Sequence, residues 1–306
     1  MKPVKLSLIA PAHNEEDNIR PFVEKVLETF RKNSIEGEII MVDDASNDRT
    51  RTLLHELKAR TPNMQIIENR VRMGITGSIQ QGYDVAQGTY IIFLPSDLQS
   101  DPGEDIPKLL EPLEQGYDIA AGFRQNRVEE TVKIISSRIF NAVSRILFGV
   151  SFRDLGWIKG FRRDILDELG PLRSDWHRFF LILAAEKGFK ILEVPTTVYP
   201  RKFGKSKFGK TGFGRAFGAL LDIISIRLLL SFSRKPMFVF GSLGGISLFA
   251  GFAGGSYLIY LKIAQGSIGA HIPLLFFVVL SVISGIQFFM FGFIAEMIAG
   301  IKEKKK

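Results

Sequence analysis

The chain of 306 residues contains no cysteine and only two tryptophans and four histidines. The lack of cysteine excludes disulfide bonds and metal sites built from thiolates. Acidic residues are in the minority, since 32 of them stand against 40 basic residues and leave a net charge of +8. We therefore expect a polyanionic partner: nucleic acid, an anionic membrane surface or a phosphorylated substrate. Residues 1–12 contain only a short, interrupted apolar run, which predicts no signal peptide.

Charge is almost absent from the C-terminal part of the chain. The ranges 236–261 and 272–295 contain no Asp, Glu, Lys or Arg. At a rise of about 1.5 Å per residue, either range as a helix is long enough to cross a hydrocarbon core of roughly 30 Å. The alternative is a pair of buried helices in a soluble protein, for which two such runs leave little room. Lys262 and the residues up to His271 are predicted to form a tight loop between the two helices.

Basic residues flank the open side of this predicted hairpin, at 233–235 and 302–306. The positive-inside rule therefore places both termini and the N-terminal domain in the cytoplasm. Residues 201–215 carry six basic residues and no acidic one, and 218–233 resemble a helix lying on a membrane surface. We expect four parts in a multi-pass protein of the cell membrane: a cytoplasmic domain at 1–210, juxtamembrane amphipathic helices at 211–235, a transmembrane hairpin at 236–301 and a basic tail at 302–306.

Short apolar runs alternate with amphipathic segments over the first two hundred residues. Strands are predicted at 4–10, 38–42, 64–67, 90–94, 118–121 and 189–194. Helices are predicted at 15–31, 48–60, 75–87, 104–115, 130–148 and around 176–187. This alternation predicts an α/β fold whose parallel sheet is covered by helices on both faces. Ligands of such sheets bind beyond the carboxyl ends of the strands, which here are the loops at 11–16, 43–48, 69–74 and 95–101.

Polar motifs follow the predicted strands in a fixed order: Pro11–Glu16, Asp43–Asp48, Asp97–Gln99 and Gly122–Arg124. In this order they resemble the motifs of glycosyltransferase family 2, and most closely its dolichol-phosphate mannose synthase-like branch, which includes bacterial undecaprenyl-phosphate glycosyltransferases. The resemblance covers residues 4 to about 210, and the two-helix anchor is similar to that of the bacterial members. It implies a Rossmann-like GT-A fold and transfer of a sugar from a nucleotide sugar, UDP- or GDP-linked, to a polyprenyl phosphate.

The resemblance assigns the first loops to the sugar donor. Pro11, Asn14, Glu15 and Asp43 would line the nucleotide pocket, and Asp97 with Gln99 would hold the diphosphate and its divalent metal. Mg²⁺ or Mn²⁺ suits such oxygen ligands. The same loops supply the further donor-binding candidates Asp44, Arg72, Gly74 and Ser96.

Other interpretations of these loops stay open. Asn14 and Asp48 are also compatible with helix N-caps. The adjacent carboxylates of Asp43 and Asp44 repel one another unless a ligand or a donor group uses them. Pro95 departs from the family, which usually has Asp-x-Asp here, so Asp97 would bind the metal more weakly than two carboxylates do.

The acceptor side depends on basic residues. Related synthases have basic residues at the places of Arg124 and Arg138 that grip the acceptor phosphate, and the planar guanidinium suits that task. Arg138 is also compatible with a solvated position on a helix. Related enzymes carry an aspartate at Asp154, beside the reacting sugar. A phosphate acceptor, whose second pKa is about 6, is already largely ionised, so we expect Asp154 to orient a substrate rather than remove a proton.

Three further segments are candidates by the same resemblance. Trp157 would stack on a sugar ring, unless it is a core residue, and His177 with Arg178 would lie on the sugar side. The segment 201–207 resembles the Gly-x-Ser-Lys loop of the family. Its phosphate-binding candidates are Arg201, Lys205, Ser206 and Lys207. The same charges also suit a basic stripe beside an anionic membrane, and both roles are compatible.

The predicted reaction is a single displacement with inversion at the sugar. A processive polysaccharide synthase of the same superfamily is a weaker alternative, because the chain has no Gln-x-x-Arg-Trp motif and few membrane helices. A catalytically inactive, nucleotide-sugar-binding partner subunit is the other alternative, favoured by Pro95. Nucleic acid is not expected as a partner, because the basic residues cluster next to the apolar ranges. Similar two-helix enzymes assemble as tetramers, and the sequence does not specify the sugar.

Overall fold

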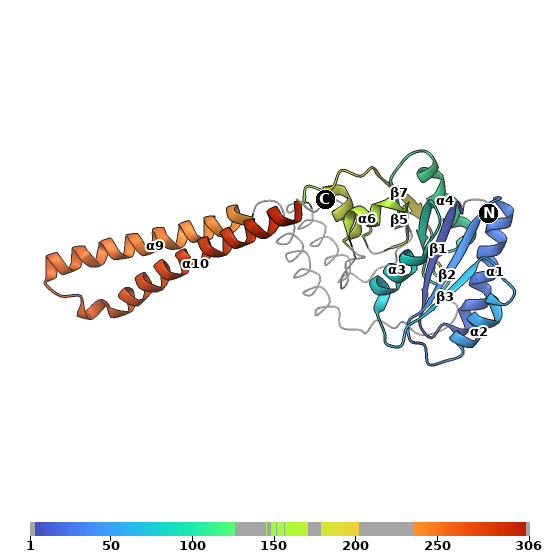
Figure 1. Cartoon of the computed structure of the whole chain (residues 1–306), viewed down its shortest axis with the longest axis horizontal. Helices are drawn as coiled ribbons and strands as arrows, with labels where there is room; N and C mark the ends of the chain where they lie inside the picture. The colour runs from blue at the N-terminus through green and yellow to red at the C-terminus, as the bar shows by residue number, and fades with distance from the viewer. Residues whose placement is uncertain are drawn as a thin grey trace. The chain divides into compact units, whose positions relative to one another are not determined.

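A computed structural model describes residues 4–125, 145, 148–150, 152–155, 157–170, 179–201 and 236–303 of the chain. The described residues up to Arg201 belong to one compact unit, and those from Pro236 onward belong to a second (Figure 1).

A seven-stranded sheet forms the centre of the first unit. Its strands are β1 (Leu6–Ala12), β2 (Gly37–Asp43), β3 (Met64–Glu68), β4 (Tyr90–Phe93), β5 (Ile119–Arg124), β6 (Lys159–Arg162) and β7 (Ile191–Thr196). They lie in the order β3-β2-β1-β4-β6-β5-β7. All six predicted strands are present, and the pairs that do not include β6 are parallel.

Strand β6 corrects the prediction of a wholly parallel sheet. It pairs antiparallel with β4 on one side and with β5 on the other. Its four residues include a lysine and a glycine, so it lacks the apolar run by which the other strands were predicted. Because β6 runs against its neighbours, the residues that precede it lie at the edge where β4 and β5 end. Asp154 and Trp157 reach that edge in this way.

Helices cover both faces of the sheet, as predicted (Figure 1). On one face lie α1 (Glu16–Lys32), α2 (Thr50–Lys58) and α4 (Pro102–Glu114), and on the other lie α3 (Gly74–Val85), α6 (Asp164–Leu169) and α7 (Phe180–Glu186). Alternate residues of β1 show the division: Leu8 belongs to the core shared with α1, whereas Ile9 packs against Gly82 of α3. On the α3 face, the rings of Phe161 in β6 and Phe180 in α7 lie 4.9 Å apart between centroids.

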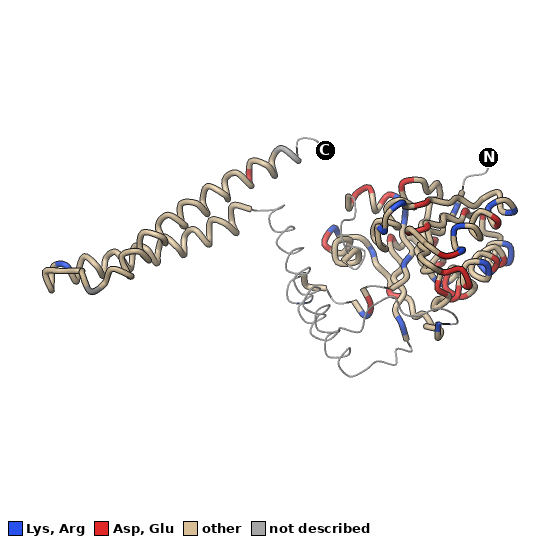
Figure 2. The backbone as a smooth tube through the Cα atoms, turned by 90° about the horizontal axis from the view of Figure 1, so that it is seen from below, with Lys and Arg blue, Asp and Glu red and all other residues tan. Residues whose placement is uncertain are grey.

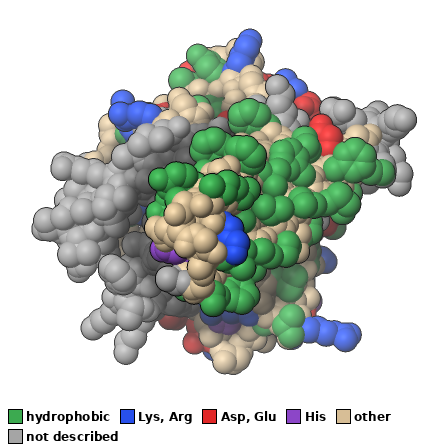
Figure 3. All heavy atoms as spheres, turned by 90° about the vertical axis from the view of Figure 1, so that its left-hand side faces the viewer, with side chains coloured by type: hydrophobic (Ala, Val, Ile, Leu, Met, Phe, Trp, Pro, Cys, Tyr) green, Lys and Arg blue, Asp and Glu red, His purple; other side chains and the backbone are tan. Residues whose placement is uncertain are grey.

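The second unit is a hairpin of two long helices, α9 (Pro236–Gln265) and α10 (Ile272–Glu303), with the short 3-10 helix η2 (Gly269–His271) between them. Helix α9 continues to Gln265, so Lys262 lies in its last turn rather than in the predicted loop. Both helices are long and apolar enough to cross a membrane, and little of either helix is buried. Charges are nearly absent along them (Figure 2), and hydrophobic side chains cover much of the visible surface of the hairpin (Figure 3). Such a surface needs apolar surroundings.

The two hairpin helices approach one another closely at Gly244 and Gly285. A Cβ atom at position 244 would lie 2.7 Å from the ring of Phe289 and 2.9 Å from the carbonyl oxygen of Gly285. A Cβ atom at Gly285 would lie 3.1 Å from the carbonyl oxygen of Gly244. Small residues at such contacts allow membrane helices to pack backbone against backbone. Gly245, the next residue of α9, has open space where its Cβ would lie.

Two neighbouring substitutions test this contact. Gly244→Val should destabilise the hairpin by about 1–3 kcal/mol, because the added methyl groups overlap Phe289 and the Gly285 backbone. Gly245→Val carries the same loss of backbone freedom without the overlap and serves as the control. The measurement is the unfolding midpoint of the purified protein in detergent. Equal midpoints for the two variants would contradict the packing described.

Candidate active site

The loops after β1, β2 and β4 are joined by hydrogen bonds at the carboxyl edge of the sheet. The buried hydroxyl of Ser96 donates to the carbonyl oxygen of Pro11 at 2.8 Å. The backbone N–H of Asn14 donates to Ser46 Oγ at 3.0 Å. Asn14 has a φ of 52°, a left-handed conformation that asparagine adopts more readily than most residues. The donor-binding candidates Pro11, Asn14 and Ser96 are thus brought together.

The adjacent carboxylates of Asp43 and Asp44 are both buried, and protein groups satisfy each of them. Asp43 accepts from Arg51 Nε at 3.1 Å and from the N–H of Ser46 at 3.2 Å. Asp44 accepts from the side chain of Asn69 at 3.1 Å and from the N–H groups of Met73 and Gly74, at 2.6 and 2.9 Å. Asp44 therefore anchors the start of α3. Arg72, in the same loop, is exposed.

Asp48 and Asn14 differ in the capping role that was open for both. Asp48 accepts from the N–H of Thr50 at 2.9 Å and from the N–H of Glu16 at 3.3 Å, so its carboxylate serves the first turns of α2 and α1. The side-chain oxygen of Asn14 instead accepts from the N–H of Asn47 at 2.9 Å. Glu15 is buried and accepts from the side chain of Asn18 at 2.6 Å. These contacts fix the relative positions of the first two loops.

The candidate metal ligand Asp97 forms an ion pair with Arg201. Its Oδ2 lies 2.7 Å from Arg201 Nη2, and its Oδ1 accepts from the N–H of Gln99 at 3.2 Å. The carbonyl oxygen of Gln99 accepts from the N–H of Tyr199 at 2.9 Å. Burial raises the pKa of the Asp97 carboxyl, while the Gln99 N–H and the charge of Arg201 oppose that rise. The segment after β7 therefore lies against the loop that follows β4.

A second arginine–carboxylate pair lies at the end of β5. Arg124 donates to both oxygens of Asp154, at 2.5 Å from Nε and 3.2 Å from Nη2. Its guanidinium lies 5.1 Å from the ring centroid of Trp157, within the range of a cation–π contact. Trp157 also packs against the main core and donates from its indole N–H to Thr196 Oγ1 at 3.0 Å. The structure thus brings together three predicted residues, Arg124, Asp154 and Trp157.

Lys159, the first residue of β6, was not among the sequence candidates. Its side chain is buried on the α7 face of the sheet, where Nζ lies 3.3 Å from the carbonyl oxygen of Leu155 and 5.8 Å from the ring centroid of Phe180. Burial lowers its pKa to about 8, and the negative charge of Asp154 partly offsets that effect. A single lysine between Ile158 and Phe161 in an otherwise apolar stretch was the available signal.

Lys159 should make stability depend on pH above neutrality. Between pH 8 and its unfolded pKa of roughly 10.4, the folded state releases this proton while the unfolded state keeps it, so the free energy of unfolding rises with pH. Between pH 7 and pH 9.5 we expect the wild type to gain on the order of 2 kcal/mol relative to Lys159→Met. Denaturation in detergent at both pH values measures the difference. Lys190→Met, at an exposed lysine, is the control, and the same pH dependence in all three proteins would contradict the assignment.

Several predicted site residues lie outside the described residues. They are Arg138, His177, Arg178, Lys205, Ser206 and Lys207.

The donor set around Asp97 fits a divalent metal only in part. Among the described residues, no group of three or more histidine and acidic side chains is arranged to hold a metal ion. Asp97 offers one carboxylate, and Gln99 is its near neighbour. Mg²⁺ is commonly bound through one or two carboxylates, with substrate phosphates and water supplying the remaining ligands. The residues present therefore fit a metal whose ligands come largely from a bound diphosphate.

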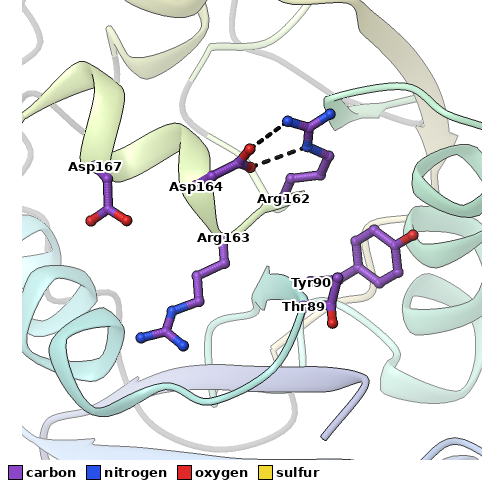
Figure 4. Close-up of a pocket in the computed structure, with 6 residues that line it drawn as sticks. All are labelled: Thr89, Tyr90, Arg162, Arg163, Asp164 and Asp167. Carbon is purple, nitrogen blue, oxygen red and sulfur yellow. Dashed lines mark hydrogen bonds and ion pairs between the residues drawn. The ribbon is translucent and has the colours of Figure 1, made fainter. Parts of the chain in front are cut away.

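A cavity of about 330 Å³ lies elsewhere on the first unit (Figure 4). Its lining residues are Thr89, Tyr90, Arg162, Arg163, Asp164 and Asp167. They belong to the start of β4, the end of β6 and the start of α6, and so to the sheet edge opposite Asp97 and Arg124. Arg162 is paired there with Asp164 and Asp118. This cavity is separate from the candidate active site.

Comparison with known proteins identifies the family. Residues 7–170, more than half of the chain, match the model of glycosyl transferase family 2. The chain belongs to glycosyltransferase family 2. The dodecaprenyl-phosphate galacturonate synthase of Rhizobium johnstonii is 31% identical over 97% of this chain and 88% of its own length. The undecaprenyl-phosphate 4-deoxy-4-formamido-L-arabinose transferase of Pectobacterium atrosepticum is 32% identical over the same shares of the two chains. These relatives of the glycosyltransferase are polyprenyl-phosphate sugar transferases.

Solved structures confirm the GT-A-like fold of this glycosyltransferase. The glucosyl-3-phosphoglycerate synthase of Mycobacterium tuberculosis with phosphoglyceric acid aligns with a TM-score of 0.56 at 20% identity, covering 72% of this chain and 79% of that one. The same enzyme with Mn²⁺, UDP-glucose and phosphoglyceric acid aligns with a TM-score of 0.56 at 19% identity, covering 73% of this chain and 79% of that one. At this identity the likeness concerns the fold.

Proposed function

We propose that this family 2 glycosyltransferase moves a sugar from a nucleoside diphosphate sugar to a polyprenyl phosphate at a membrane surface. The observation that carries the proposal is the pair of arginines, Arg201 and Arg124, at one edge of the sheet, because the reaction has two phosphate-bearing substrates. Each guanidinium forms an ion pair with a carboxylate that fixes its direction. The names of the related transferases and the two apolar C-terminal helices support a polyprenyl phosphate as acceptor.

The short segment from Thr196 to Arg201 contacts the surroundings of both arginines. Thr196, at the end of β7, accepts a hydrogen bond from Trp157 beside Arg124. Tyr199 contacts Gln99, and Arg201 contacts Asp97. The two phosphate groups would therefore be held by parts of one connected structure, which favours their alignment for direct transfer.

On the donor side, we assign the nucleotide to the loops that carry Pro11, Asn14, Glu15 and Asp43. Arg201 would meet the diphosphate. Asp97 and Gln99 would hold Mg²⁺ or Mn²⁺, which supplies positive charge to the leaving diphosphate when it is bound. A structural neighbour crystallised with Mn²⁺ and UDP-glucose supports this assignment at the level of the fold.

On the acceptor side, Arg124 and Arg138 would grip and aim the lipid phosphate. A phosphate oxygen attacks the anomeric carbon, the bond from that carbon to the diphosphate oxygen breaks, and the nucleoside diphosphate leaves from the opposite face with inversion. The attacking oxygen is already ionised at neutral pH, so no base is required. Asp154, held by both of its oxygens to Arg124, suits a positioning role.

We further propose that α9 and α10 span the cell membrane, with both termini and the first unit in the cytoplasm. The basic residues at 201–215, 233–235 and 302–306 support that orientation. They would also attract an anionic membrane surface.

A product screen tests the proposed function. Full-length protein in detergent, incubated with a panel of UDP- and GDP-sugars, undecaprenyl phosphate and Mg²⁺ or Mn²⁺, should yield a glycolipid that mass spectrometry detects as the sugar-linked polyprenyl monophosphate. Nucleotide binding without any glycolipid across the panel would instead support the inactive partner subunit.

Arg124→Ala tests the acceptor site. Because one phosphate contact is worth about 1.5–3 kcal/mol, removing the guanidinium should raise the KM for polyprenyl phosphate at least tenfold or abolish transfer. Donor binding should persist. Asp154→Asn should also raise the KM for polyprenyl phosphate and should change kcat less than KM. The pH dependence of transfer should stay as in the wild type, because Asp154 is not assigned as a base. Arg20→Ala, which removes an exposed ion pair with Glu56, is the control. Unchanged transfer in Arg124→Ala would defeat the assignment.

A further inference from the structure

Asp97 and Arg201 form an ion pair that is largely shielded from water. The exposed fractions of their side chains are 13% for Asp97 and 18% for Arg201. The contact joins residues 104 positions apart in the sequence, at 2.7 Å. Water screens such a pair only weakly, so separating the two charges without replacement partners is costly.

Arg201 occupies the Asp97 oxygen that a metal ion would need. Asp97 Oδ1 accepts the Gln99 N–H, and Oδ2 faces the Arg201 guanidinium. Pro95 supplies no second carboxylate. A divalent ion approaching Asp97 on its own must displace the Arg201 guanidinium from that oxygen, which opposes metal binding.

A diphosphate changes the competition between Arg201 and the metal ion for Asp97. Its oxygens offer the displaced guanidinium a new bidentate partner and offer the metal most of its ligands. The diphosphate thus compensates Arg201 for the contact that it gives up at Asp97. Metal binding and diphosphate binding should therefore assist one another, with equal effect in both directions.

We propose that Arg201 competes with the metal for Asp97 Oδ2 until the donor binds, so that the divalent ion binds only together with the nucleoside diphosphate. On donor binding, Arg201 would move from the carboxylate to the diphosphate, and Asp97 Oδ2 would then be available as a metal ligand. The same arginine gives the diphosphate a contact that does not need the metal. This inference rests on the proposed function for the presence of a diphosphate, but the effect of Arg201 on metal binding is measurable without one.

Binding of Mn²⁺ alone tests the proposal directly. Free Mn²⁺ is measured by electron paramagnetic resonance with full-length protein in detergent, first without nucleotide. The wild type should bind Mn²⁺ weakly at this site, and Arg201→Gln should bind it about tenfold more tightly, because the competing cation is gone. Pro95→Asp should also tighten binding by adding a carboxylate. Arg201→Lys should stay close to the wild type, and Arg20→Gln is the control for the loss of an exposed arginine.

The second part of the experiment adds UDP or GDP. In the wild type, the effective nucleotide should tighten Mn²⁺ binding at least tenfold, and Arg201→Gln should reduce that gain and weaken nucleotide binding in the absence of metal. Asp97→Asn should abolish the site in all conditions. Circular dichroism of each variant establishes that it is folded.

The outcomes distinguish failure of the proposed function from failure of the role assigned to Arg201. Failure of the wild type to bind either nucleotide, with or without Mn²⁺, would contradict the proposed function. Nucleotide binding combined with equal affinities of wild type and Arg201→Gln for Mn²⁺ alone would overturn the role of Arg201 and leave the proposed function intact. Arg201→Lys behaving like Arg201→Gln would also overturn it, because the retained charge would then be without effect.

Discussion

Hydrogen bonding of β6 to both β4 and β5 is the constraint on which the candidate active site depends. The reversed direction of this strand turns the chain so that the residues before it lie beside residues that follow β4 and β5. Asp154 and Trp157 thereby reach Arg124. In a wholly parallel sheet, the segment before a strand would lie at the opposite edge, and the acceptor-side cluster would not form.

The four aspartate candidates at this edge are matched by arginines or by N–H donors. Asp43 pairs with Arg51, Asp97 with Arg201 and Asp154 with Arg124, while Asp44 receives three N–H donors. This matching stabilises charges that would otherwise be costly to bury. It also fixes the direction of each guanidinium, so a phosphate ligand meets oriented donors, although it must compete with the resident carboxylate.

The sequence predicted the parallel strands and their helices because apolar runs and helical spacing are local signals. It did not predict β6, whose lysine and glycine are read as loop residues and whose pairing comes from two distant strands. The candidate residues after the strands were found through ordered motifs, and Arg124, Asp154 and Trp157 do meet. The contact between Asp97 and Arg201 could not be predicted, because nothing local in the sequence joins positions 104 residues apart. Lys159 was missed because burial, which makes it unusual, depends on the position of α7.

The segment from Thr196 to Arg201 sets the distance between the two arginine clusters. Thr196, Tyr199 and Arg201 reach the indole of Trp157, the backbone of Gln99 and the carboxylate of Asp97 in turn. The number of residues between these contacts is set by the separation of the partners, which are held by different strands. Insertion or deletion of a single residue between 196 and 201 would therefore disturb the two clusters together, although neither would lose a side chain. The number of residues in this segment is therefore constrained by geometry, as the identity of its charged residue is constrained by chemistry.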